Sequence, residues 1–175
     1  MPGDERTALL IDLDKTSLGA RGRNDKVIDN ARVQAVEHTM QAALGDQFDA
    51  SAFKSVYDRL NQPEYHYFTA DNQDYLAYIC LMVNGGVCPP DELWSKLGQG
   101  VLTDVVQFAE MCEARRASMP PGLLAVQEEV LRGIQTEDPT PFKGFRRGEY
   151  LETVAHMDLL PDDAEEADVL RSEIT

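Results

Sequence analysis

Two aspartates, Asp12 and Asp14, close a short apolar run near the start of the chain, and Thr16 follows them. Two carboxylates this close repel each other, so both stay ionised only when a cation lies nearby. Mg2+ is the natural cation, because hard divalent ions prefer oxygen ligands. Asp12 could then attack a phosphorus atom and form an aspartyl phosphate, while Asp14 could serve as general acid and later as general base. Thr16 could hold the loop by hydrogen bonding.

The apolar run must position these carboxylates. Residues 7–12 form an uninterrupted, mostly apolar segment bounded by polar residues, which predicts a strand buried on both faces of a parallel sheet. Ligands of such sheets bind beyond the carboxyl ends of the strands. Residues two apart on a strand point the same way, so Asp12 and Asp14 would face one pocket if the chain stays extended. The alternative interpretation is a polar turn after a buried strand.

Residues 11–16, IDLDKT, resemble motif I of the haloacid dehalogenase (HAD) superfamily, in which Asp-x-Asp-x-Thr follows an apolar strand. The resemblance implies an α/β core of the Rossmann type, with Asp12 as nucleophile, Asp14 as general acid/base and Thr16 in support. It also implies that Mg2+ binds to Asp12 and Asp14, through a side chain and a backbone carbonyl respectively. Lys15 departs from the family, where glycine is commoner. The dehalogenase branch lacks the second aspartate, so Asp14 favours phosphoryl transfer.

Two arginines follow the motif in a loop that contains glycines. Arg21 and Arg23 could bind an anionic substrate, because the planar guanidinium suits phosphate or carboxylate. In the family a mobile flap occupies this place. The alternative is a solvated loop whose arginines pair with the many acidic residues of the chain.

The rest of the chain is predicted to be mostly α, since apolar residues recur every three or four positions between glycines and prolines. We expect three segments. Residues 1–24 hold the first core strand, motif I and the flap loop; residues 25–116 form a helical cap domain; residues 117–175 form a helical segment that returns toward the core. Within the last segment, residues 137–147 are predicted to be a loop and a short helix is predicted near residues 150–157. The aromatic cluster at 65–68 could wall a pocket or form a seam between helices.

The family has three further motifs: a Ser or Thr that ends a second strand, a Lys, and an acidic pair. We find none of them after the predicted cap. Lys143 has loop surroundings, and the acids that follow Pro161 fit the start of a helix, where carboxylates are favoured. One strand cannot form a stable sheet. We therefore expect these residues to be the first part of a longer enzyme, with little turnover of their own.

Composition limits the partners. A net charge of −15 argues against a nucleic-acid groove and against anionic membrane surfaces. Three cysteines, an odd number without metal-ligand spacing, fit a reduced cytoplasmic protein. No stretch approaches the roughly 20 apolar residues of a membrane span. The oligomeric state is left open.

The leading hypothesis is therefore a Mg2+-dependent phosphohydrolase of the HAD type that acts on a small phosphorylated metabolite. A phosphotransferase or phosphomutase would share the aspartyl phosphate and differ only in the group that attacks it. A hypothesis of another class is a non-catalytic, mostly helical interaction module, which predicts an exposed apolar face.

Overall fold

The structure is a computed structural model that describes residues 23–156, and within this range the chain is helical and has no strand. Eight α-helices follow one another: α1 (Arg23–Leu44), α2 (Ala50–Leu60), α3 (His66–Thr69), α4 (Gln73–Asn84), α5 (Pro90–Gly98), α6 (Val105–Glu113), α7 (Pro121–Gln135) and α8 (Lys143–His156). Three short 3-10 segments join them: η1 (Gly45–Gln47), η2 (Pro63–Tyr65) and η3 (Arg116–Ser118). The prediction of a mostly helical chain is confirmed for these residues.

Short polar side chains begin several of the helices. Asp49 caps α2 by accepting hydrogen bonds from the backbone N–H groups of Ser51 and Ala52, at 2.9 and 3.0 Å. Asn72 caps α4 and Asp104 caps α6 in the same way. These side chains satisfy N–H groups that have no partner inside the helix. α5 and α7 instead begin with proline, whose missing N–H costs nothing at that position.

Helix α4 is the centre of the hydrophobic core. All eight residues from Leu76 to Val83 are buried, so this helix presents no solvent face along most of its length. α2, α6, α7 and α8 all contact it. The Phe108 ring of α6 packs edge-on against Tyr78 and Phe68, with centroid distances of 5.8 and 6.1 Å. Such edge-to-face pairs add to the stability that burial provides.

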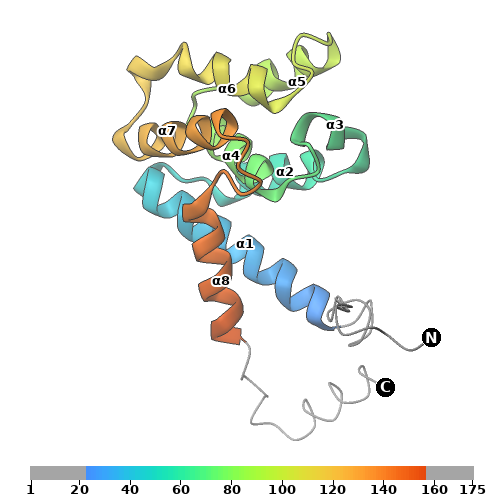
Figure 1. Ribbon diagram of the computed structural model, residues 1–175, viewed down its shortest axis with the longest axis vertical. Helices are drawn as coiled ribbons and strands as arrows, with labels where there is room; N and C mark the ends of the chain where they lie inside the picture. The colour runs from blue at the N-terminus through green and yellow to red at the C-terminus, as the bar shows by residue number, and fades with distance from the viewer. Residues whose placement is uncertain (1–22, 157–175) are drawn as a thin grey trace, which may run out of the picture.

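Helices α1 and α8 pack against each other and cross, and both extend beyond the body formed by the other helices (Figure 1). Gly148 lies at the crossing, where a Cβ atom would stand 3.5 Å from the Cβ atom of Ala35. A hydrogen bond of 2.7 Å joins Nδ1 of His38 to Oε1 of Glu152. The chain therefore enters the helical body along α1 and leaves it along α8, and the two helices are in contact where they cross.

The sequence prediction and the structure differ at the start of α8. The loop predicted for residues 137–147 is wrong in its second half, because α8 begins at Lys143. Phe142 and Phe145 are buried and their rings pack against each other, 6.0 Å apart. A spacing of three residues places both rings on the same side at the start of α8, where they pack into the hydrophobic core.

One cluster of buried hydrophobic side chains includes residues from both sides of the boundary expected between residues 116 and 117. Val36, Leu81 and Phe108 share it with Leu123 and Phe145. The division of the chain into cap and returning segment remains a prediction. The strand expected at residues 7–12, and with it the α/β core, lies outside the described residues.

Candidate functional site

The catalytic residues expected from the sequence lie outside the described part of the chain. Asp12, Asp14, Thr16 and Arg21 all precede residue 23, and their roles remain predictions. Arg23 is the first residue of α1, and the structure describes its backbone. Arg23 therefore lies in a helix and not in the predicted loop, and α1 begins seven residues after Thr16.

Within residues 23–156 no group of three or more His, Cys, Asp or Glu side chains could hold a metal ion. His38 has a carboxylate partner, Glu152, on α8. His66 faces Asp71, with 3.6 Å between Nδ1 and Oδ1. Each of these two histidines has a single acidic partner among the described residues, which fits a local pair of side chains better than a metal site.

The three cysteines are free and buried. Burial raises the pKa of all three thiols, that of Cys88 to about 11 and that of Cys112 to about 12. The thiolate is the nucleophilic form of cysteine, and a raised pKa suppresses it at neutral pH. These cysteines are therefore packing residues of the core.

The described residues contain an aromatic groove, which we define by Arg59, Glu64, Tyr65, Tyr67, Trp94, Leu97 and Gly98. It is a hollow of about 240 Å³ between the end of α2, η2, α3 and one face of α5. The guanidinium of Arg59 lies over the Trp94 ring, with Cζ 3.9 Å from the ring centroid. Nε of Arg59 donates a hydrogen bond of 3.1 Å to the Tyr65 hydroxyl.

A second hollow, of about 230 Å³, lies between α2, α4 and the start of α5. Its lining is mostly apolar, and its two main polar residues bond to each other. Nδ2 of Asn84 donates to the carbonyl of Asp49 at 2.8 Å, and the Asp49 N–H donates to Oδ1 of Asn84 at 3.1 Å. Because these groups satisfy each other, this hollow offers little for polar recognition.

Asp74, in the first turn of α4, is the one fully buried carboxylate among the described residues. Its Oδ2 accepts a hydrogen bond of 3.0 Å from the Phe142 N–H, and its Oδ1 pairs with Arg146 of α8. Burial raises its pKa, although the Phe142 N–H and the Arg146 charge pull the pKa down. Both of its oxygens are engaged by the start of α8, so we assign it a structural role.

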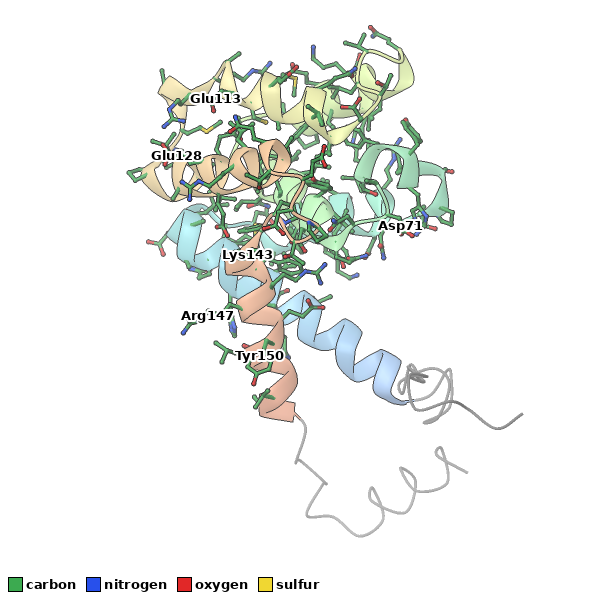
Figure 2. All side chains as sticks on the ribbon, in the orientation of Figure 1. Asp71, Glu113, Glu128, Lys143, Arg147 and Tyr150 are labelled. Atoms are coloured by element: carbon green, nitrogen blue, oxygen red, sulfur yellow. The ribbon has the colours of Figure 1, made fainter. Side chains whose placement is uncertain are left out.

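The outer side of α8 carries an apolar strip, defined by Tyr150, Leu151 and Val154, with exposures of 66%, 52% and 45%. Tyr150 and Val154 are one helical turn apart. Figure 2 shows Tyr150 and Arg147 on the part of α8 that extends beyond the body. An exposed apolar strip on one helix is a feature of interaction surfaces.

Comparison of the chain with protein-family models, with curated proteins and with solved structures finds no match. Among the helices that the structure describes, none is both long and apolar enough to cross a membrane. The function must therefore be inferred from the residues of the chain itself.

The sequence allows the aromatic cluster at 65–68 to be a pocket wall or a seam between helices, and the structure shows both. Phe68 is buried in the core, whereas Tyr65 and Tyr67 line the aromatic groove. Arg59 was missed, because its partner Trp94 is 35 positions away along the chain. The only signal available was that Trp94 is the single tryptophan of the sequence.

Proposed function

We propose that the chain is the motif-bearing and cap portion of a Mg2+-dependent phosphohydrolase of the HAD type. The observation that carries the proposal is the spacing of Asp12, Asp14 and Thr16 directly after an apolar run. Asp12 supplies the nucleophile and Asp14 the proton transfers. The substrate is a small phosphorylated metabolite.

The reaction proceeds in two steps. A carboxylate oxygen of Asp12 attacks phosphorus while the bond to the leaving oxygen breaks, and Asp14 gives that oxygen its proton. Asp14 then accepts a proton from water, whose oxygen attacks phosphorus and releases phosphate from Asp12. The Asp12 side chain and the Asp14 backbone carbonyl would supply oxygen ligands, the donor type that Mg2+ prefers, and bound Mg2+ would offset the negative charge of Asp12 and of the phosphate.

The arrangement of α1 and α8 supports the assignment of the helical part as a cap. A domain inserted into another must receive the chain and return it at neighbouring points. α1 begins at Arg23, seven residues after Thr16, and α8 packs against it before the chain leaves the described residues. Figure 1 shows both helices extending from the body on the same side.

Hydrolysis of p-nitrophenyl phosphate in the presence of Mg2+ tests the proposal. Protein expressed from the complete reading frame should hydrolyse the ester, and Asp12→Asn should reduce the rate to background because the amide is not a nucleophile. Asp4→Asn, a change of the same kind outside the motif, should retain the wild-type rate. Equal rates for wild type and Asp12→Asn would refute the nucleophile assignment.

The effect of Mg2+ on the melting temperature tests the proposal in a second way, and it can be measured on the 175-residue chain. A ligand that binds the folded state raises the melting temperature. Mg2+ should therefore stabilise the wild type more than Asp12→Asn, which loses a carboxylate ligand. The same small shift in both proteins would contradict the metal assignment.

The apolar strip on α8 favours a second candidate function, a non-catalytic interaction module. Tyr150, Leu151 and Val154 are exposed at a spacing that one partner helix could cover. This function predicts self-association or partner binding that Tyr150→Glu abolishes, and no effect of Mg2+ on stability. Sedimentation of the wild type and Tyr150→Glu, each with and without Mg2+, separates the two functions.

A further inference from the structure

We propose that the aromatic groove is a binding site for a small anion, a carboxylate or a phosphate, that carries a flat apolar group. Arg59 would bind the anionic group, and Tyr67, Trp94 and Leu97 would contact the flat group. None of these residues belongs to motif I. The proposal is therefore independent of the phosphohydrolase assignment.

Arg59 is held in place by aromatic side chains. Its guanidinium lies over the Trp94 ring at 3.9 Å, and its Nε donates to the Tyr65 hydroxyl at 3.1 Å. The Tyr65 and Trp94 rings pack at a centroid distance of 6.0 Å, so the two supports reinforce each other. A guanidinium fixed in this way loses less conformational freedom when it binds a ligand than a solvated one would.

The binding end of Arg59 has no partner among residues 23–156, the part of the chain that the structure describes. A guanidinium has five N–H donors, and Nε accounts for one of them. Among the residues that the structure describes, no group accepts a hydrogen bond from either Nη atom of Arg59. In contrast, Arg115, Arg116 and Arg146 each pair with a carboxylate. The two Nη groups form the fork that binds carboxylate or phosphate with two parallel hydrogen bonds.

The residues that line the groove limit the size and the charge of the ligand. Trp94 and Leu97 lie on one face of α5, and Gly98 adds no side chain there. The hollow of about 240 Å³ is below the usual size of drug-binding pockets, so one ring with one anionic group is the fitting class. Glu64 also lines the groove, and its negative charge would weaken the binding of any anion there.

Fluorescence of Trp94 gives a direct test, because it is the only tryptophan of the chain. Benzoate and phenyl phosphate should each change the emission saturably, and the comparison identifies the preferred anion. Acetate, inorganic phosphate and benzyl alcohol, which lack either the ring or the charge, should bind at least about tenfold more weakly. The net charge of −15 disfavours non-specific uptake of anions, so saturable binding indicates a local site.

Substitutions in the aromatic groove test whether the ligand binds there. Arg59→Met should abolish binding and Arg59→Lys should weaken it about tenfold, because lysine keeps the charge but not the fork. Arg147→Met is the matched control: this exposed arginine of α8 lies outside the groove, and its loss should leave affinity unchanged (Figure 2). Glu64→Gln should tighten binding. Since Arg59 itself contacts the fluorophore, ligand-observed NMR measures the same affinities independently.

Three results would overturn the proposal. The first is no saturable binding of either aryl anion, and the second is equal loss of affinity in Arg59→Met and Arg147→Met. The third is benzyl alcohol binding as tightly as benzoate, which would show that the anion is not recognised. Circular dichroism confirms that the variants are folded, and Arg59→Lys tests the fork if the methionine variant does not fold.

Discussion

Replacing Asp74 by alanine should loosen α8 from the helical body. The Asp74 carboxylate is the point at which α4 holds the start of α8, through the Phe142 N–H at 3.0 Å and through the Arg146 side chain. Alanine removes both interactions and leaves the buried Phe142 N–H without its acceptor. Because α8 packs along α1, the effect should reach the point where the chain enters the body.

The size of the destabilisation in Asp74→Ala can be estimated from the interactions that are lost. An unsatisfied buried N–H costs about 1–3 kcal/mol, and breaking a buried ion pair costs about 3–5 kcal/mol. The Arg146 side chain is 31% exposed and also pairs with Glu149, so water and Glu149 can offset part of the second cost. We expect Asp74→Ala to lower the free energy of unfolding by about 3 kcal/mol. For a chain of this size that corresponds to about 6–12 °C in melting temperature.

Asp74→Asn separates charge from hydrogen bonding. The amide oxygen can still accept from the Phe142 N–H, so the loss at pH 7 should be about 1 kcal/mol. The pKa of Asp74 is raised above its ordinary value of 3.8, chiefly by burial. A raised pKa means that the folded state binds the proton more tightly, so Asp74 favours folding more as the pH falls. The wild type should therefore gain stability relative to Asp74→Asn between pH 7 and pH 4.

Urea unfolding followed by circular dichroism at several pH values measures both effects. Asp58→Asn is the control, because Asp58 is an exposed residue of α2 whose one ion-pair partner among the described residues is Lys54. Its loss should change stability by less than about 0.5 kcal/mol. A stability of Asp74→Ala within that margin of the wild type would refute the anchoring role. A wild type that loses stability relative to Asp74→Asn on acidification would show that the ion pair, not burial, controls the pKa.

Two further predictions concern packing and acid stability. Gly133→Ala should destabilise the fold by about 1–2 kcal/mol although alanine has the better helix propensity, because its Cβ atom would stand 2.5 Å from Pro141. Gly98→Ala should stabilise the fold by about 0.5 kcal/mol, because a Cβ atom there would meet nothing within 4 Å. Thermal melts of the two variants and the wild type measure both effects. The hydrogen bonds from Arg115 lower the pKa of Glu92, so this pair stabilises the fold above the ordinary pKa of 4.5 and loses its effect as the pH falls. Arg115→Met should cost about 1 kcal/mol at pH 7 and less at pH 3, as urea titrations at the two values would show.

The helices of the body could be predicted from local sequence signals. Gly45 and Gly85 follow the ends of α1 and α4, and Pro90 and Pro121 begin α5 and α7. These residues act on their own backbone, through φ values and missing N–H groups, so their effect does not depend on the fold. Apolar spacing then identified the buried faces of the helices between them.

The start of α8 and the aromatic groove could not be predicted in the same way. An acidic residue in the first turn of a helix, such as Asp74, usually faces solvent, and only the structure brings Phe142 and Arg146 to it across about 70 residues. The groove likewise depends on Arg59 meeting Trp94, which no local pattern indicates. Contacts of this kind depend on how distant helices pack together, so no local pattern around either partner indicates them.

The charge of the chain makes the environment of Arg59 informative. Acidic residues outnumber basic ones by 31 to 16, so an exposed guanidinium should usually find a carboxylate, as Arg115 and Arg116 do. Arg59 instead packs on aromatic rings, although Glu64 lines the same groove. If the packing of Arg59 on Trp94 only stabilised the fold, Arg59→Met should lower the melting temperature, and the wild type itself should not bind aryl anions. If it serves recognition, Arg59→Met should abolish aryl-anion binding at little cost in stability, while Asp12→Asn should leave that binding intact.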